Sequence, residues 1–206
     1  MSRLESEMTD SEAITGGARP KTTDKRDRLV ASACRLFYEQ GIERTTLADV
    51  AGAADVPLGN VYYYFKTKDD LVRAVVNTQV DAVESVTTAL GRHRTPAARL
   101  KALVAELASR ADDIALYGCP HGTLCTELHK QPAGEGLGSE RLIEASVAWA
   151  EKQFKEMGRR DARDLAIQLT GAYQGAAVVT QALGDPSVLK REGRRIERWV
   201  DSLASS

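Results

Sequence analysis

The chain has 206 residues, of which 43% are apolar and 28% are charged, and its net charge is −1. This composition is typical of a globular protein and excludes a fibrous or fully disordered chain. No apolar run approaches the roughly 18 residues that a membrane span needs, and the first residues lack the apolar core of a signal peptide. The three cysteines are an odd number, which argues against a disulfide framework. We therefore expect a cytoplasmic protein that does not associate with a membrane.

The first part of the chain divides into an irregular arm and short helices. Residues 1–22 combine Ser, Thr, Gly and acidic side chains without an apolar period, which predicts a disordered arm. A helix is predicted from Asp24 to Gly41, because its apolar residues recur at helical spacing. A second helix begins after Thr46, whose hydroxyl can cap it, and a turn follows at Asp55.

A third short helix follows Pro57 and ends by about Phe65, before a fourth helix that begins near Lys68. Three short helices with a tight turn between the second and third are typical of the helix-turn-helix, whose last helix enters the DNA major groove. The tyrosine run at 62–64 fits this arrangement, because consecutive aromatic residues cannot all point into one core. A packed core segment is the alternative for this run, and the flanking lysines fit it poorly.

Longer helices are predicted for the remainder of the chain, at residues 68–90, 96–116, 139–157, 161–183 and 187–203. A segment rich in Gly and Pro, residues 117–138, interrupts them. No stretch shows the alternation of a half-buried strand. The sequence therefore predicts an all-α fold.

The segment TTLADVAGAADVPLGNVYYYFKTKDDL, residues 45–71, resembles the DNA-binding domain of the tetracycline-repressor (TetR) family of transcriptional regulators. The resemblance implies a helix-turn-helix DNA-binding domain over residues 23–68 and a helical effector-binding and dimerisation domain over residues 69–206. The segment departs from the family pattern in two respects. Asp55 replaces the usual turn glycine, and the third helix has no Arg or Lys, so that bidentate reading of guanine by arginine is not available from it.

The resemblance implies DNA contacts in and beside the second and third helices. Thr45 and Thr46 would hold a phosphate with a hydroxyl and a backbone N–H. Asn60 would read an adenine edge and Tyr63 would meet bases or thymine methyls, while the other tyrosines and the lysines would contact phosphates. The full predicted set is Thr45, Thr46, Leu58, Gly59, Asn60, Tyr62, Tyr63, Tyr64, Lys66 and Lys68. The inward-facing residues are predicted to be Val61 and Phe65. Further basic residues either add backbone or minor-groove contacts or are only solvated, namely Arg19, Lys21, Lys25 and Arg26.

In the family that the segment resembles, the middle helices surround an effector cavity and the last two helices form a four-helix bundle with a second subunit. The predicted cavity residues, each of which alternatively belongs to the core, are Leu103, Leu107, Tyr117, Cys119, Leu124, Trp149, Phe154 and Tyr173. The predicted interface residues, for which packing within one chain is the alternative, are Gly171, Gly175, Ile196, Trp199, Val200 and Leu203. Because one recognition helix reads too few base pairs, we expect a homodimer on a palindromic double-stranded DNA operator, with half-sites about 34–36 Å apart or further.

The segment YGCPHGTLCTELHK, residues 117–130, concentrates cysteine and histidine. Cys125 and His129 have a spacing that can clamp one metal ion together with Cys119 or His121, and Cys119 is a candidate thiol sensor. Packing is the simpler interpretation, and we expect neither a metal nor a cofactor.

No carboxylate–histidine pair, nucleophile motif or phosphate-binding glycine loop is present, which disfavours an enzyme. The sequence thus predicts a dimeric transcriptional regulator, a repressor that a small apolar or aromatic effector releases from DNA. The alternative is a redox- or metal-responsive regulator of the same fold that uses the Cys/His segment.

Overall fold

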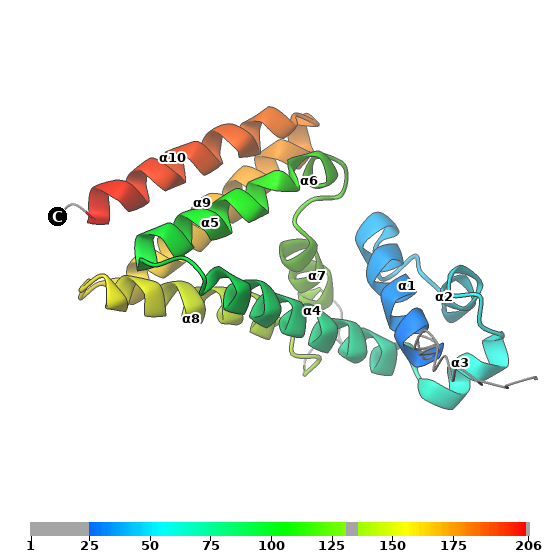
Figure 1. Ribbon diagram of the computed structural model, residues 1–206. Coiled ribbons are helices and arrows are strands. Elements are labelled where there is room, and N and C mark those ends of the chain that lie inside the picture. Colours follow the sequence, from blue (N-terminus) through cyan, green and yellow to red (C-terminus); the bar gives the residue numbers. More distant parts are fainter. Residues whose placement is uncertain (1–24, 131–135, 205–206) are drawn as a thin grey trace, which may run out of the picture.

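The computed structural model describes residues 25–130 and 136–204, and these residues form ten helices without a strand (Figure 1). The all-α prediction is therefore confirmed. The helices are α1 (Lys25–Gln40), α2 (Leu47–Ala53), α3 (Leu58–Tyr64), α4 (Lys68–Leu90), α5 (Pro96–Ser109), α6 (Ala111–Tyr117), α7 (Pro120–His129), α8 (Glu140–Glu156), α9 (Ala162–Leu183) and α10 (Pro186–Ala204). The predicted arm at 1–22, with Arg19 and Lys21, lies outside the described residues.

Side-chain caps determine where α2 and α4 begin. The Thr46 hydroxyl accepts a hydrogen bond from the Asp49 amide, and the Asp49 carboxylate accepts one from the Thr46 amide. Thr67 and Asp70 repeat this reciprocal capping box at α4. These hydrogen bonds lower the pKa of both carboxyl groups. The local sequences TTLAD and KTKDD thus determine the residues at which α2 and α4 begin.

The turn between α2 and α3 depends on Asp55, which has a φ of 50°. Aspartate tolerates the left-handed region better than most residues, so the turn survives without the usual glycine, as predicted. The Arg28 side chain of α1 donates a hydrogen bond to the Asp55 carbonyl and ties the turn to the first helix. Pro57 is the N-cap of α3. It therefore precedes the first turn of the helix, where a proline is expected from the sequence.

Two apolar cores lie at opposite ends of the molecule, and α4 runs between them (Figure 1). The first core joins α1–α3 to the first half of α4 and to Leu124 and Leu128 of α7. The second core joins α5, α6, α8, α9 and α10. The first core continues along α4 as far as Val80, beyond the domain boundary that was expected after residue 68. The continuous helix α4 therefore connects the two ends of the molecule.

The connection between the cores differs from the expected one. The helix predicted at 96–116 is divided at Arg110, which ends α5 and precedes α6. The region expected to be irregular, 117–138, contains α7, which follows Gly118 at a φ of 81°. Among the described residues, no helix combines the length and the apolar character that crossing a membrane requires.

Candidate nucleic-acid interface and ligand cavity

The outer face of α3 presents aromatic side chains to solvent. Tyr63 is 76% exposed and Tyr62 is 49% exposed, whereas Val61 and Phe65 of the same helical turn are buried. The predicted inward orientation of Val61 and Phe65 is thus confirmed. Burial of the aliphatic face against α1 and α2 fixes the direction in which the tyrosines point, because side chains one position apart lie on different faces of a helix.

Neighbouring groups hold the rings and cations of this face in place. The Tyr63 and Tyr64 rings meet edge to face with centroids 5.0 Å apart. The Lys66 ammonium donates a hydrogen bond of 2.9 Å to the Tyr62 carbonyl, and the Arg26 guanidinium lies 5.4 Å from the centroid of the Phe65 ring. Arg26 and Lys66 therefore place positive charge beside α3, which itself has none.

The structure corrects the predicted role of Thr45. Its side chain is fully buried, donates to the Gly41 carbonyl at 2.7 Å and accepts from the Gln40 amide at 3.1 Å. The Thr45 hydroxyl holds the end of α1 and is not available to a phosphate. Thr46 is exposed, but Asp49 engages both its hydroxyl and its amide. A phosphate contact by Thr46 therefore requires the capping box to open.

A cavity of about 140 Å³ lies among α4, α5, α8, α9 and the connection between α6 and α7. Of the predicted cavity residues, the lining contains Leu103, Leu107, Cys119 and Tyr173. The other four predicted residues are outside the lining of this cavity. Tyr117 packs edge to face on Tyr38, Leu124 belongs to the first core, Phe154 belongs to the second core and Trp149 packs against it.

Sequence reasoning missed the polar part of this lining. It comprises Gln79 and Thr87 from α4, Glu106 and Arg110 at the end of α5, His121 of α7, Ser146 of α8, and Thr170 and Gln174 of α9. Burial, followed by the positive charge of Arg110, lowers the pKa of His121 to about 4, so its imidazole is neutral near pH 7. Burial also raises the pKa of Tyr173. No periodic pattern distinguishes such residues from solvated ones, since a polar side chain on a helix is ordinarily at the surface.

The Cys/His segment does not assemble a metal site in the described residues. Among them, no group of three or more His, Cys, Asp and Glu lies close enough to hold an ion. The Cys125 thiol donates to the Ser139 carbonyl at 3.0 Å, and the His129 ring pairs with the Cys125 carbonyl at 2.9 Å. Burial raises the pKa of Cys125 to about 11. A thiol with a raised pKa reacts slowly, so neither the metal nor the thiol alternative gains support from Cys125.

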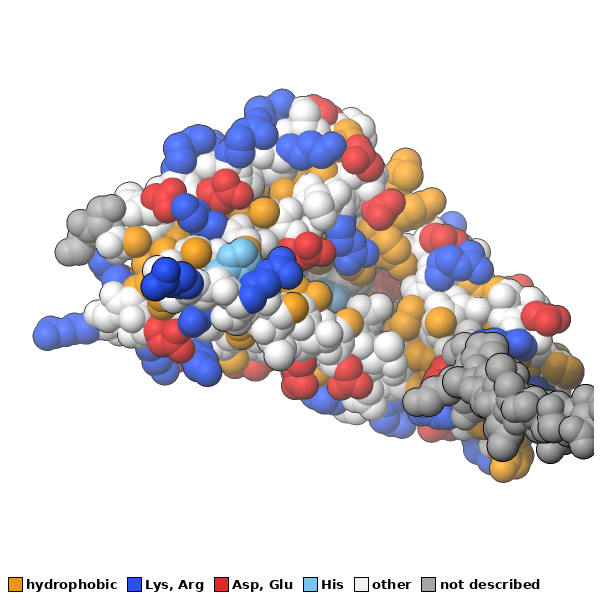
Figure 2. All heavy atoms as spheres, viewed as in Figure 1, with side chains coloured by type: hydrophobic (Ala, Val, Ile, Leu, Met, Phe, Trp, Pro, Cys, Tyr) orange, Lys and Arg blue, Asp and Glu red, His pale blue; other side chains and the backbone are white. Residues whose placement is uncertain are grey.

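The residues predicted for the dimer interface differ in exposure between α9 and α10. Gly171 and Gly175 are exposed on α9, in open space, beside Ile167 and Val178, which are 52% and 65% exposed. By contrast, the predicted residues of α10 pack inside their own chain. Ile196 and Val200 are buried in the second core, and Trp199 and Leu203 pack against it. The stripe on α10 is therefore an intrachain contact, and the outward face of this helix is rich in Lys and Arg (Figure 2).

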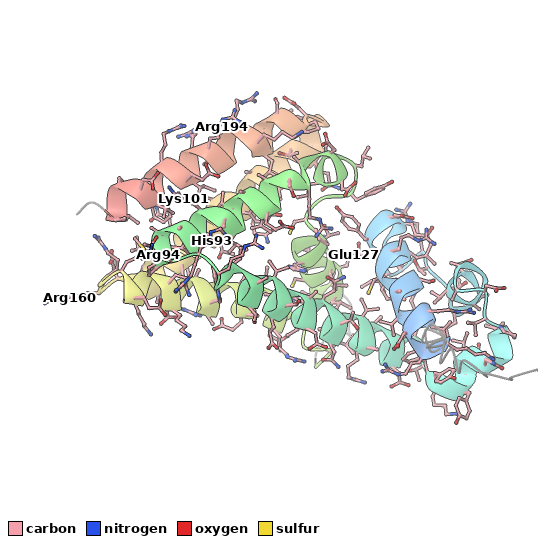
Figure 3. The ribbon with its side chains drawn as sticks, viewed as in Figure 1. His93, Arg94, Lys101, Glu127, Arg160 and Arg194 are labelled. Carbon is pink, nitrogen blue, oxygen red and sulfur yellow. The ribbon has the colours of Figure 1, made fainter. Side chains whose placement is uncertain are left out.

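Two hydrogen bonds join the cavity region to the helix-turn-helix. The Tyr38 hydroxyl of α1 donates to the Gly118 carbonyl at 2.9 Å, next to the cavity residue Cys119. The Glu127 carboxylate of α7 accepts from the Ile42 amide at 2.8 Å, and Figure 3 shows its side chain projecting from α7 toward α1. The first core and these bonds connect α7 to α1, in addition to the connection through α4.

Comparison with known proteins agrees with this geometry. The family described as bacterial regulatory proteins, tetR family, matches residues 29–75. The HTH-type transcriptional regulator TtgR of Pseudomonas putida is 24% identical over 195 residues, covering 89% of this chain and 91% of that protein. The HTH-type transcriptional regulator BetI of Burkholderia thailandensis is 37% identical over 86 residues, covering 39% of this chain and 43% of that protein.

Solved structures share the fold as well. A TetR transcriptional regulator from Legionella pneumophila superposes with a TM-score of 0.78 at 17% identity, covering 87% of this chain and 98% of that one. The reduced form of NemR from Escherichia coli superposes with a TM-score of 0.73 at 17% identity, covering 84% of this chain and 95% of that one. The chain therefore carries, over residues 29–75, the helix-turn-helix domain of the tetR family of bacterial regulatory proteins, and its all-helical fold is similar to that of solved TetR regulators.

Proposed function

We propose that this regulator is a homodimeric repressor that binds a palindromic operator and is released from it by a small, largely apolar effector. The observation that carries the proposal is the path of α4. This helix begins at Lys68, beside the recognition helix α3, and its residues Val83 and Val86 line the cavity. An effector that repositions α4 would therefore move the recognition helix.

The α3 face is the proposed contact with DNA. Exposed Tyr62 and Tyr63 would meet phosphates, bases and thymine methyls, and Asn60 would read an adenine edge. Lys66 and Lys68 would neutralise phosphates beside the rings. Since α3 offers no arginine to guanine, sequence preference would come from Asn60, from methyl contacts and from the shape of the duplex.

The α9 face is the proposed contact between subunits. Its glycines leave open space beside exposed aliphatic side chains, so that a second α9 can approach closely. Burial of aliphatic area gives about 25 cal/mol per Å², and two-fold symmetry makes the patch self-complementary. A dimer built here would carry two recognition helices to two half-sites.

Release requires a difference in affinity between two conformations. An effector that prefers the conformation incompatible with DNA by about 1–3 kcal/mol would lower operator affinity about 5- to 150-fold. The bonds from Tyr38 to Gly118 and from Glu127 to Ile42 provide a second route from the cavity to α1.

The test begins with DNA duplexes selected by the protein from a random pool, for which binding is measured by fluorescence anisotropy over a range of salt concentrations. The proposal predicts a two-fold symmetric consensus and an affinity that falls steeply with salt, because phosphate contacts release counterions. A consensus without two-fold symmetry contradicts the dimeric arrangement.

A further inference from the structure

The cavity lining points to the charge and size of the effector, an inference that rests on the proposed function. Three groups of the lining can form strong polar interactions: the Arg110 guanidinium, the Glu106 carboxylate and the His121 imidazole. The other polar side chains of the lining have partners within the chain, and those of Gln79 and Tyr173 are the thiols of Cys34 and Cys119. The hydroxyls of Thr87, Ser146 and Thr170 donate to carbonyls of their own helices, and the Gln174 amide donates to the Cys119 sulfur.

Arg110 has a specific position at this cavity. It is the junction residue that ends α5 and precedes α6. Within the described part of the chain, its guanidinium forms no hydrogen bond and no ion pair, although Glu106 lies one helical turn earlier on the same lining. Arg110 is exposed, so water satisfies the five donors of its guanidinium until an oxygen-bearing ligand replaces it.

The positive charge of Arg110 reaches two side chains of the cavity lining. Arg110 lowers the pKa of His121 and opposes the rise in the pKa of Tyr173, and no carboxylate contributes to either shift. The His121 ring is neutral near pH 7 because of its burial, so it can donate one hydrogen bond without adding charge. Arg110 and His121 suit an anion or a strong acceptor, whereas the exposed Glu106 carboxylate is the group of this lining that would favour a cation.

The volume limits the apolar part of the ligand. The cavity of about 140 Å³ is close to the roughly 150 Å³ apolar cavity that accommodates benzene in another protein. Its walls are aliphatic on three sides, from Val83 of α4, Leu107 of α5 and Leu169 of α9. One six-membered ring fills this space, whereas a fused two-ring system exceeds it.

We infer that the effector is a single-ring aromatic carboxylate, with its ring among α4, α5 and α9 and its carboxylate at Arg110 and His121. Benzoate is the simplest probe of this class. Benzamide has almost the same shape without the charge, benzylamine has the opposite charge, and 2-naphthoate has the charge on a larger ring system.

Titration calorimetry on the full chain tests the inference directly. Benzoate is expected to bind at least about tenfold more tightly than benzamide, since hydrogen bonds to a charged group exceed neutral ones by an energy of this order. Benzylamine and 2-naphthoate are expected to bind more weakly than benzoate. Equal binding of benzamide or benzylamine overturns the assigned charge, and tighter binding of 2-naphthoate overturns the assigned size.

Variants then assign the carboxylate contact to Arg110. Arg110→Gln is expected to weaken benzoate binding about tenfold and to leave benzamide binding within about threefold. Arg94→Gln is the matched control, because Arg94 lies on the exposed loop between α4 and α5, outside the cavity lining (Figure 3). Arg110→Lys keeps the charge and should retain part of the affinity. An equal loss in both glutamine variants would show that only the overall charge matters, and it would overturn the contact.

Operator binding by the same preparations separates this inference from the proposed function. If the protein binds its selected duplex but none of the aromatic probes, the assignment of the effector class fails and the DNA-binding proposal stands. If benzoate binds as expected but leaves operator affinity unchanged, the assignment of the cavity stands and the proposal that an effector releases the protein from DNA is wrong.

Discussion

Replacement of Tyr63 by alanine separates DNA recognition from folding on a single helix. Tyr63 is 76% exposed, and its ring packs edge to face on Tyr64. If half of its exposed area, roughly 75 Å², meets DNA, the contact contributes about 2 kcal/mol per subunit at about 25 cal/mol per Å². One to two such losses in a dimer lower operator affinity by roughly 30- to 900-fold. The free energy of unfolding should change by less than about 1 kcal/mol, the value of the aromatic pair.

Val61→Ala is the matched comparison, two positions earlier and fully buried. Loss of its two methyl groups from the first core should cost about 2 kcal/mol of stability and lower the melting temperature by about 4–8 °C. Tyr63→Phe should keep operator affinity within about threefold, because the ring supplies most of the area. Fluorescence anisotropy and thermal unfolding measure both quantities on each variant. If Tyr63→Ala binds the selected duplex as tightly as the wild type, the assignment of the α3 face to DNA is wrong.

Three further changes test other parts of the structure. Val178→Asp places a charge on the exposed α9 face and should convert the dimer to a monomer in sedimentation, without loss of helicity; a persistent dimer contradicts the α9 interface. Tyr38→Phe leaves the buried Gly118 carbonyl without its donor and should lower the free energy of unfolding by about 1–3 kcal/mol in denaturant titrations; an unchanged value shows that this bond contributes nothing. Burial raises the pKa of Cys125 to about 11, so about one thiol in ten thousand is ionised at pH 7. Alkylation of Cys125 by iodoacetamide should therefore be slow at pH 7 and accelerate as pH rises toward that pKa, and rapid alkylation at pH 7 would contradict the burial of this thiol.

The helix-turn-helix was predictable because each of its local signals is contained in a few adjacent residues. Thr46 and Asp49 form a capping box within one turn, and Asp55 occupies the turn at a positive φ. The alternation of buried Val61 with exposed Tyr62 and Tyr63 follows from helical geometry. The role of Thr45 was mispredicted, because a threonine beside a capping threonine has the same local pattern whether it faces a phosphate or the core.

Only part of the cavity lining could be predicted from the sequence. An apolar side chain that lines a cavity has the same helical spacing as one that packs in a core, so Leu107 and Phe154 could not be distinguished from the sequence. The residues that give the cavity its polarity, Arg110 and His121, meet there only because the chain breaks between α5 and α6 and turns again before α7. Those breaks depend on tertiary packing.

The subunit interface shows a similar limit. The apolar stripe on α10 and the small residues on α9 both suggested helix packing, and both predictions of packing were reasonable. Packing within the chain uses the α10 stripe, since Ile196 and Val200 are buried against the second core. Of these two helices, α9 is the one whose described residues include exposed large aliphatic side chains, such as Ile167 and Val178, that a second subunit could cover. A helical pattern shows that a face is apolar but does not identify what covers it.

The most direct test of the central claim is the stoichiometry of the complex on a selected duplex, measured by native mass spectrometry. We predict two chains on one two-fold symmetric duplex, and one chain for Val178→Asp on an isolated half-site. A single wild-type chain bound to the full duplex would contradict the claim that two recognition helices act together through a dimer.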